Sequence, residues 1–452
     1  DTETTPLPAY HDDDRAALDP YKARVRTIQF ATNDTAVVFD LNSVDTAILT
    51  PLWERPLCFH NAVFDVKFLR KAGIFPSRVG CTLMMDLILR GGGKGRRLQD
   101  LTEEKLGIII PKEEQLSDWS ATTLSEEQIS YAAMDAAATY RLCTALSKEI
   151  NNKGMRTVAR IYQQAVPAVA SISFEGLPFD SVLHARFVSE KKEEHVRIGR
   201  SLRINMGIDD LSHKKEIAQW FMTYAKEKNY QLVIGKNGVA KIGKESLAKY
   251  QDDPIVADYL QYGELSSWLT TFGEPLSKKV HASTERLHPS IFPCRAATGR
   301  FSSHNPNVQN LPRGDFKKIF AATPGRTIIV ADYSQIELRL AAIVADEDTM
   351  LTAYAGGEDL HRLTASKILN VSEESVTKEQ RKHAKAVNFG FIYGQREKGF
   401  IISAKNSYGI DVSLQAAKNY RKEFFKTYPK LTSWHEKIKN ELYMTGAIST
   451  HN

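Results

Sequence analysis

Cysteine is scarce in this chain of 452 residues. The four that are present, Cys58, Cys81, Cys143 and Cys294, lie far apart and form no C-x-x-C pair. This spacing argues against a zinc site or a disulfide framework and suits a reducing compartment. Long hydrophobic runs are also missing, so no segment predicts a membrane span. The sequence has neither an internal repeat nor a low-complexity segment.

The composition is that of a globular chain with a divided charge. Hydrophobic residues make up 42% and charged residues 25% of the sequence, and the length predicts two to four domains. Residues 1–150 carry 17 Lys and Arg against 22 Asp and Glu, whereas residues 151–452 carry 43 against 32. A basic body behind an acidic first part predicts a polyanion partner and carboxylate chemistry, with ordinary surface charge as the alternative.

The pattern of the first 150 residues is typical of an α/β unit. Residues 25–40 predict two strands around an Asn-Asp turn, and a helix is expected from Ser125 to about Lys148. Other expectations are a Gly-basic loop at 91–97, long exposed helices at 184–229, a loop-rich stretch at 230–254, an ordered loop at 294–316, and mostly helices from 327 onward after one strand.

Carboxylates in the first part have a spacing that allows convergence. If Asp1 and Glu3 lie on a strand, their side chains point from the same face of it. Asp65 lies within a helical pattern of apolar residues. Tyr131 and Asp135 are four residues apart, so both lie on one helix face. Converging carboxylates repel one another unless hard cations such as Mg²⁺ or Mn²⁺ neutralise them. Taken singly, each acid is more simply a solvated surface residue and Tyr131 a half-buried core aromatic.

The ordered set D-x-E, N-x-x-x-F-D and Y-x-x-x-D resembles the motifs of the DEDD 3′→5′ exonucleases, in the tyrosine-containing subtype. The resemblance covers residues 1–150 and implies a ribonuclease H-like domain that binds the 3′ end of single-stranded DNA. It implies two Mg²⁺ (or Mn²⁺) ions clamping the attack of water on a phosphodiester, with Tyr131 orienting that water.

Another candidate acid, Asp332, follows an apolar run in the second part of the chain. Residues 327–331 predict a buried strand, after which Asp332 precedes a helical pattern starting at Ile336. Ser334 and Glu337 fit the S-x-x-E capping box, so a simple helix cap is one interpretation.

The segments "CRAATGRFSSHNPNVQNLP", "DYSQIELR", "EDLHRLTASKIL" and "RKHAKAVNFGFIYG" occur in this order and resemble the family A DNA polymerases, of the DNA polymerase I type. The implied fold class is α/β plus mainly α, an exonuclease domain followed by a right-hand polymerase whose C-terminal part lies beyond the given chain. The expected domains are exonuclease 1–155, first palm part 156–183, thumb 184–285, palm with the Asp332 motif 286–340, and incomplete fingers 341–452.

The resemblance assigns a metal and a sugar site around Asp332. The Asp332 carboxylate and the backbone carbonyl of Tyr333 would be ligands of two Mg²⁺ ions at which the primer 3′-hydroxyl attacks the triphosphate. Glu337 would crowd the sugar C2′ and exclude ribonucleotides, and Gln335 would lie near the sugar and the minor groove.

A helix with one basic stripe is expected after the T-x-x-Q capping box at 377–380. Arg381, Lys385 and Phe389 recur every fourth residue. The resemblance places Arg381 and Lys385 on phosphates, Phe389 against the sugar and base, and Tyr393 near the template. It makes His361 a further phosphate contact, whereas alone it would be a helix-surface histidine.

The polar loop after residue 299 is expected to contact DNA. By resemblance, four side chains would line the duplex near the primer end and check its shape through the minor groove. They are Arg300, Asn307, Gln309 and Asn310. A polar loop packed on the palm is the alternative. The basic helices at 184–229 resemble the thumb, whose grip on phosphates would depend on salt.

These patterns predict a DNA-directed DNA polymerase with proofreading, acting on primer–template DNA and dNTPs, with no membrane partner; they do not reveal whether a processivity factor binds it. It would be cytoplasmic in a bacterium or a phage-infected cell, or organellar. The family's second palm acid, in a His-Asp-Glu motif, does not occur before Asn452, so we expect further natural sequence and no polymerase activity without it. Two alternatives stay open: a standalone 3′→5′ exonuclease whose basic body holds DNA, and a DNA-binding accessory protein with decayed catalysis.

Overall fold

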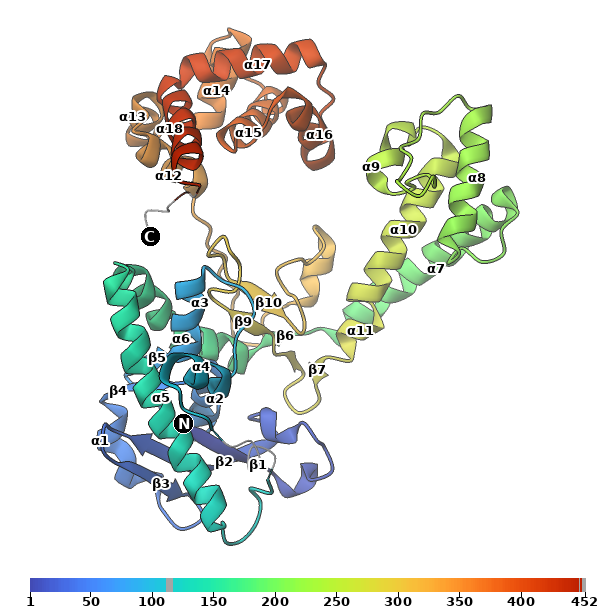
Figure 1. Ribbon diagram of the computed structural model, residues 1–452. Coiled ribbons are helices and arrows are strands. Elements are labelled where there is room, and N and C mark those ends of the chain that lie inside the picture. Colours follow the sequence, from blue (N-terminus) through green and yellow to red (C-terminus); the bar gives the residue numbers. More distant parts are fainter. Residues whose placement is uncertain (111–116, 447, 449–452) are drawn as a thin grey trace. The chain divides into compact units, whose positions relative to one another are not determined.

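The computed structural model describes residues 1–110, 117–446 and 448. The chain divides into two compact units, Asp1–Ile328 and Ile329–His451 (Figure 1). The first unit combines sheets and helices, whereas the second is built of helices in its described part. This division confirms the fold class of an α/β part followed by a mainly α part. It does not test the expected domain boundaries, which stay predictions.

Two small sheets form the framework of the first 81 residues. Strands β1 (Thr2–Pro6), β2 (Ala23–Ala31) and β3 (Ala36–Asp40) are antiparallel in the order β1-β2-β3. Strands β4 (Pro56–Phe59) and β5 (Arg78–Cys81) pair in parallel. The hairpin expected at residues 25–40 is therefore confirmed, and its turn is closed by Thr32 N–H donating to the Thr35 carbonyl at 2.8 Å.

Helices surround these strands and bury the core. The helix predicted from Ser125 is confirmed, since the Ser125 hydroxyl and the Gln128 side chain form a reciprocal capping box. Phe68, Leu69 and Leu87 are almost fully buried beside the strands. The helices are α1 (Thr50–Trp53), α2 (Val63–Lys71), α3 (Thr82–Arg90), α4 (Leu98–Leu106), α5 (Glu126–Asn152) and α6 (Arg156–Glu175), with 3₁₀ helices η1 (Pro8–Tyr10), η2 (Ala16–Leu18) and η3 (Thr46–Leu49).

The rest of the first unit contains a helical arm and short strands. Helices α7 (Ser181–Met206) and α10 (Pro254–Phe272) pack closely: His195 stacks on Tyr262 at 4.2 Å between ring centroids. A Cβ at Gly199 would lie 2.9 Å from the Tyr262 ring, so a larger residue here would have to displace this ring. The remaining elements are α8 (Lys214–Glu227), α9 (Lys244–Leu247), α11 (Glu274–Ser277), η5 (Ala248–Tyr250), η6 (Asp315–Ile319), β6 (Leu177–Pro178), β7 (Val280–His281), β8 (Arg286–Leu287), β9 (Ser290–Phe292) and β10 (Ser302–His304).

The second unit packs its helices around aromatic side chains. Phe391, Phe400, Phe424 and Tyr428 are almost fully buried, and the Tyr428 hydroxyl is hydrogen-bonded to the Thr364 hydroxyl at 2.7 Å. The elements are α12 (Ile336–Ala345), α13 (Asp348–Ala355), α14 (Leu360–Leu369), α15 (Lys378–Ile392), α16 (Glu397–Tyr408), α17 (Leu414–Thr427) and α18 (Pro429–Thr445), with η7 (Glu373–Ser375). The capping box predicted at Thr377 and Gln380 forms at the start of α15.

The buried strand predicted at residues 327–331 is wrong for this structure. The segment has no regular secondary structure, and Ile329 and Val330 are 89% and 87% exposed. A strand buried on both faces needs neighbouring strands to pair its backbone and covering elements for its side chains. Within the described residues no strand pairs with this segment, so its apolar run is left in solvent.

In the part of the chain that the structure describes, no helix is both long enough and apolar enough to cross a bilayer.

Candidate active sites

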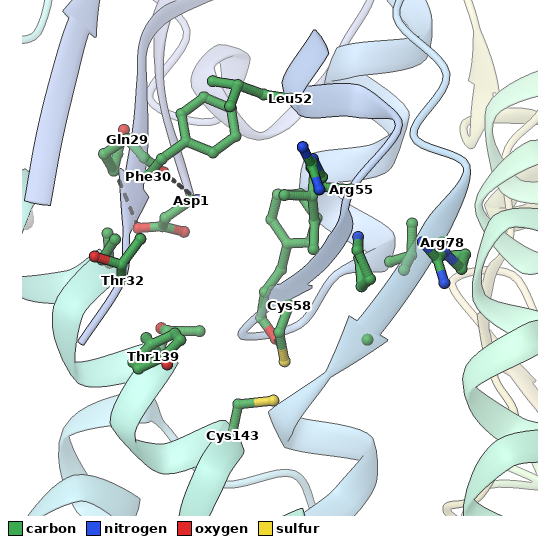
Figure 2. Close-up of a pocket in the computed structure, with 18 of the residues that line it drawn as sticks. Asp1, Gln29, Phe30, Thr32, Leu52, Arg55, Cys58, Arg78, Thr139 and Cys143 are labelled. Carbon is green, nitrogen blue, oxygen red and sulfur yellow. Dashed lines mark hydrogen bonds between the residues drawn. The ribbon is translucent and has the colours of Figure 1, made fainter.

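Three carboxylates meet between β1 and α5. Asp1, Glu3 and Asp135 each place an oxygen within 4.8 Å of the other two. Pairing of β1 with β2 sets Glu3 opposite Thr27, and the strand carries Asp1 and Glu3 toward α5, where Asp135 lies. Gln29 Nε2 donates to Asp1 Oδ2 at 3.3 Å and so orients this carboxylate (Figure 2). The convergence that the exonuclease motifs imply is present for these three residues.

Asp65 lies beside this group without being one of the three. Its side chain, near the start of α2, is 1% exposed, and its Oδ1 accepts a hydrogen bond from the Thr2 hydroxyl at 2.8 Å. Its Oδ2 is buried and has no hydrogen-bond partner. Burial raises the pKa of Asp65 above its ordinary value. The negative charge of Asp65 also acts on Glu3, so all four acids share one electrostatic environment.

Burial and mutual repulsion disfavour ionisation of the acids in this cluster, an effect that the neighbouring α-amino group of Asp1 partly opposes. Burial, together with repulsion by Asp135 and Asp65, raises the pKa of Glu3 to about 8. Burial raises the pKa of Asp135 to about 6, although the Tyr131 hydroxyl that bonds to Asp135 opposes this shift. One oxygen of Asp135 is also buried without a partner. Two partnerless carboxylate oxygens in a cluster of mutually repelling acids fit a hard divalent cation.

A cavity of about 370 Å³ opens on Asp1 and Asp135 and includes residues that the sequence did not reveal. Its lining residues are Asp1, His60, Asn61, Leu83, Gly95, Arg96, Arg97, Leu98, Gln99, Tyr131, Asp135, Phe292 and Arg295. The sequence predicts the segment 91–97 as a Gly-basic loop without a functional role, and its glycines and arginines are the signal that could have placed it here. Phe292 and Arg295 had no such signal, because they lie far downstream in the chain.

The walls of this cleft are held by charge and by stacking. Arg96 and Arg90 both bind the buried carboxylate of Asp86, which fixes the Gly-basic loop on α3. On the opposite side the Arg295 guanidinium stacks on the Phe292 ring, 3.5 Å from its centroid. Gly93 N–H donates to the Arg295 carbonyl at 2.8 Å, so loop and downstream segment are joined. The cleft is therefore a preformed feature of the first unit.

A second, mostly apolar cavity of about 580 Å³ lies behind Asp1. Figure 2 shows Phe30, Leu52 and Cys58 on its walls, with Cys143 projecting toward Cys58. The cavity carries no charged cluster, and of the candidate catalytic residues it touches Asp1 alone.

The motif that contains Asp332 lies at the start of the second unit. Asp332 and Tyr333 are exposed and precede α12 in an irregular segment. The capping box proposed for Ser334 and Glu337 is wrong: the residue that caps α12 is Gln335, in a left-handed conformation (φ 54°) and without a side-chain capping bond. Gln335 Oε1 instead accepts a hydrogen bond from the Tyr354 hydroxyl at 3.1 Å.

The stripe predicted on α15 is present. Arg381, Lys385 and Phe389 lie one turn apart along this helix, with Lys385 exposed and Phe389 half-buried. The Arg381 guanidinium pairs with Asp359 Oδ2 at 2.6 Å. Tyr393, just after the helix, is 62% exposed.

His361 differs from the surface histidine considered as an alternative. It is 2% exposed and its Nδ1 is hydrogen-bonded to the Asn388 side chain at 2.9 Å. Burial, with repulsion by Arg381, lowers the pKa of His361 to about 4. The surface interpretation is wrong because α14 packs this face against α15. The phosphate contact stays a prediction, and in this arrangement the ring is neutral and enclosed.

The polar loop predicted to contact DNA is exposed. Asn307 Oδ1 accepts from Gln309 N–H at 3.0 Å, and Gln309 Nε2 donates to the Phe301 carbonyl at 2.9 Å. These bonds stiffen the loop, while the side chains of Arg300 and Asn310 lie at the surface. The loop can thus present polar groups to a ligand, and its role stays a prediction.

Comparison with known proteins decides the family. The DNA polymerase family A pattern matches residues 190–452, and the 3′-5′ exonuclease pattern matches residues 1–151. This chain belongs to the family A DNA polymerases. It carries the polymerase region of that family behind a 3′-5′ exonuclease domain, as the motifs predicted.

Individual relatives agree with this membership. A DNA polymerase I of Aquifex aeolicus is 33% identical over 95% of this chain and 76% of its own length. A DNA polymerase I of Pseudomonas aeruginosa is 28% identical over 100% of this chain, which spans 51% of that relative. A solved structure, the POL domain of Pol1 from M. smegmatis in complex with DNA primer-template and dNTP, matches with a TM-score of 0.77 at 19% identity. That match covers 99% of this chain and 76% of the solved chain, and it shows the fold.

Proposed function

We propose that the first unit of this family A polymerase removes nucleotides from the 3′ end of single-stranded DNA with the help of two Mg²⁺ or Mn²⁺ ions. The observation that carries the proposal is the meeting of Asp1, Glu3 and Asp135 within 4.8 Å, with Asp65 beside them. Divalent metals are the general cofactors of these polymerase and exonuclease families. The ions, when bound, polarise the scissile phosphate and lower the pKa of the attacking water.

The protein's own residues then have separate tasks. Asp1, Glu3, Asp65 and Asp135 would hold the ions, because oxygens of Asp1, Glu3 and Asp135 converge and Asp65 and Asp135 each keep a buried oxygen without a hydrogen-bond partner. Tyr131 lies one turn before Asp135 on α5 and interacts with its carboxylate, so its hydroxyl is placed to orient the attacking water. His60 and Asn61 lie between β4 and α2 and line the cleft, where they can contact the terminal nucleotide.

The second activity that we propose is template-directed DNA synthesis from dNTPs on a primer–template, in a protein that also carries the family's His-Asp-Glu motif. Here Asp332 and the carbonyl of Tyr333 would hold two ions, and Glu337 and Gln335 would face the sugar. Arg381 and Lys385 would bind the triphosphate, for which Arg381 must exchange its bond to Asp359. Phe389 and Tyr393 would contact the nucleotide and the template, and His361 would assist on the phosphates.

The polar loop after residue 299, in the first unit, would supply the contacts to the DNA duplex. Arg300, Asn307, Gln309 and Asn310 would contact the duplex near the primer end, where minor-groove acceptors are common to every correct base pair. The exposed positions of these side chains support the assignment.

The exonuclease proposal is tested by a double substitution. Asp1→Ala with Glu3→Ala should abolish Mg²⁺-dependent shortening of a 5′-labelled single strand and leave its affinity in EDTA nearly unchanged, because the acids hold ions whereas basic groups hold DNA. Asp118→Ala, an exposed acid outside the cleft, is the matched control and should degrade DNA at the wild-type rate. Degradation by the double variant at the wild-type rate would exclude these acids as metal ligands.

A further inference from the structure

Two of the four cysteines meet in the apolar cavity behind Asp1. Cys58 lies on β4 and Cys143 on α5, and both line this cavity of about 580 Å³. Figure 2 shows the Cys143 side chain pointing toward Cys58. The Cys58 thiol donates a hydrogen bond to the sulfur of Cys143. Because both residues are free cysteines, the cavity holds a pair of interacting thiols.

The packing of β4 leaves room for this pair. β4 and β5 are parallel, and Cys58 lies opposite Gly80 in their register. A Cβ at Gly80 would lie 3.3 Å from Cys58 Sγ, which is tighter than an ordinary Cβ contact, so glycine gives the thiol its space. Helix α5 packs against β4 and supplies Cys143. The two thiols therefore lie at a contact between elements that are distant in the sequence.

These two thiols differ from the other two cysteines in their access to solvent. Cys58 and Cys143 are partly exposed, whereas Cys81 and Cys294 are buried. Burial raises the pKa of Cys294 to about 12 and also raises the pKa of Cys81, so both stay protonated at neutral pH. The hydrogen bond from Cys58 instead lowers the pKa of Cys143 below its ordinary value. Since the thiolate is the reactive form, Cys143 is the cysteine that an oxidant attacks first.

We infer that Cys58 and Cys143 are an oxidation site of the exonuclease domain, at which hydrogen peroxide converts the two thiols into a disulfide that ties α5 to β4. The Cys143 sulfur attacks one peroxide oxygen and the O–O bond breaks. A sulfenic acid forms on Cys143, and the departing hydroxide takes the proton that Cys143 gave up. The Cys58 thiol then attacks that sulfur, the S–S bond forms and a second water leaves. The two thiols together lose two electrons, which reduce the peroxide to two molecules of water.

The disulfide would act on the segment that carries the acid cluster. Residues 58–143 include Asp65, Tyr131 and Asp135, and Cys143 lies about two turns after Asp135 on α5. Closing a loop of this length restricts the unfolded chain, so the disulfide stabilises the folded exonuclease domain. Disulfides that form transiently on oxidation also occur in reducing compartments, where they serve as redox sensors. The chemistry needs neither a metal ion nor DNA and is therefore independent of the proposed exonuclease activity.

Peptide mapping of the full chain tests this inference. The protein is reduced, freed of reductant and treated with micromolar hydrogen peroxide, and the remaining thiols are alkylated in denaturant before digestion without reductant. We expect a linked pair of peptides that contain Cys58 and Cys143 and separate in dithiothreitol, with Cys81 and Cys294 recovered in alkylated form. The oxidised protein should also have a midpoint of thermal unfolding about 5 °C or more above that of the reduced protein.

Single substitutions separate the roles of the two sulfurs. Cys58→Ser should stop at a sulfenic acid on Cys143, which dimedone traps, because the second thiol is gone. Cys143→Ser should keep Cys58 as a thiol at the same peroxide dose, and neither variant should gain thermal stability on oxidation. Cys294→Ala is the matched control, since it removes a buried cysteine and should form the disulfide as the wild type does.

Several results would overturn the inference. One is a peroxide-treated wild type in which Cys58 and Cys143 remain unlinked. Another is a disulfide that joins either of them to Cys81, to Cys294 or to a second chain, because the two thiols would then not be each other's partners. Equal dimedone labelling of Cys58 in Cys143→Ser and of Cys143 in Cys58→Ser would contradict the order of the two steps. A linked protein with an unchanged thermal midpoint would contradict the stabilising tie between α5 and β4.

Discussion

Glu3 on β1 and Asp135 on α5 face one another with carboxylate oxygens within 4.8 Å, although they come from distant parts of the sequence. Burial, with repulsion by Asp135, raises the pKa of Glu3, and burial raises the pKa of Asp135. A folded protein keeps such an unfavourable pair of acids where a bound cation neutralises them or where their shifted pKa values serve catalysis. This relationship between two acids underlies the first predictions.

Metal binding should be visible in stability. In EDTA at pH 8, Asp135→Asn should raise the free energy of unfolding by about 2 kcal/mol, because it removes one of the repelling carboxylates. Adding Mg²⁺ should stabilise the wild type and leave Asp135→Asn nearly unchanged. Thermal denaturation with and without the ion measures both effects. An equal gain from Mg²⁺ in the two proteins would place its binding elsewhere.

The metal-free protein should lose stability as the pH rises. Glu3 has a pKa of about 8 in the folded protein against an ordinary 4.5. Above pH 4.5 the unfolded chain releases this proton while the folded protein retains it, so the free energy of unfolding falls between about pH 5 and pH 8. Urea denaturation in EDTA across this window checks the slope, and Glu3→Gln should flatten it. A slope that is unchanged in Glu3→Gln would rule out this origin.

Tyr131 should act on turnover and not on binding. Tyr131→Phe removes the hydroxyl that interacts with Asp135 and keeps the buried ring. Losing one hydrogen bond to the attacking water should lower kcat for the shortening of single strands about tenfold or more, with KM within about twofold. Tyr140→Phe, on the same helix but outside the cleft, is the control. A change in KM alone would mean that Tyr131 contacts the strand and not the water.

Phe389 should determine how strictly the 3′-hydroxyl of the incoming nucleotide is required. A phenylalanine facing the sugar offers no hydrogen bond, so a nucleotide without its own 3′-hydroxyl is poorly organised. In a protein extended through the family's His-Asp-Glu motif, Phe389→Tyr should raise dideoxynucleotide incorporation relative to deoxynucleotide by about tenfold or more. The ratio of incorporation efficiencies on one template is the measurement. An identical ratio in both proteins would show that α15 does not present this face to the sugar.

Local sequence signals predicted much of this structure. The hairpin of β2 and β3 follows from alternating apolar residues around a turn, and the starts of α5 and α15 follow from capping boxes at Ser125 and Thr377. These features depend on neighbours within a few residues. The meeting of Glu3 with Asp135 was predicted through the family motifs, because no local pattern contains information about so distant a contact.

What the sequence could not reveal depends on tertiary surroundings. Residues 327–331 are apolar and β-branched, yet a strand forms only where other strands pair with it, and the described residues supply none. His361 is polar by residue type, but the packing of α14 on α15 buries it against Asn388. Phe292 and Arg295 reach the exonuclease cleft through long-range packing that leaves no periodic trace in the sequence.

Counting bound ions tests the central claim most directly. The full chain carrying Asp332→Ala, so that the polymerase motif does not contribute, is mixed with a single-stranded oligonucleotide whose terminal linkage resists hydrolysis, and Mn²⁺ binding is followed by electron paramagnetic resonance. We predict two tightly bound ions per chain in the presence of the oligonucleotide, and a loss of both in the further variant Asp1→Ala with Glu3→Ala. Two ions retained by that variant, or none bound by its parent, would contradict the assignment of these carboxylates to a two-metal exonuclease.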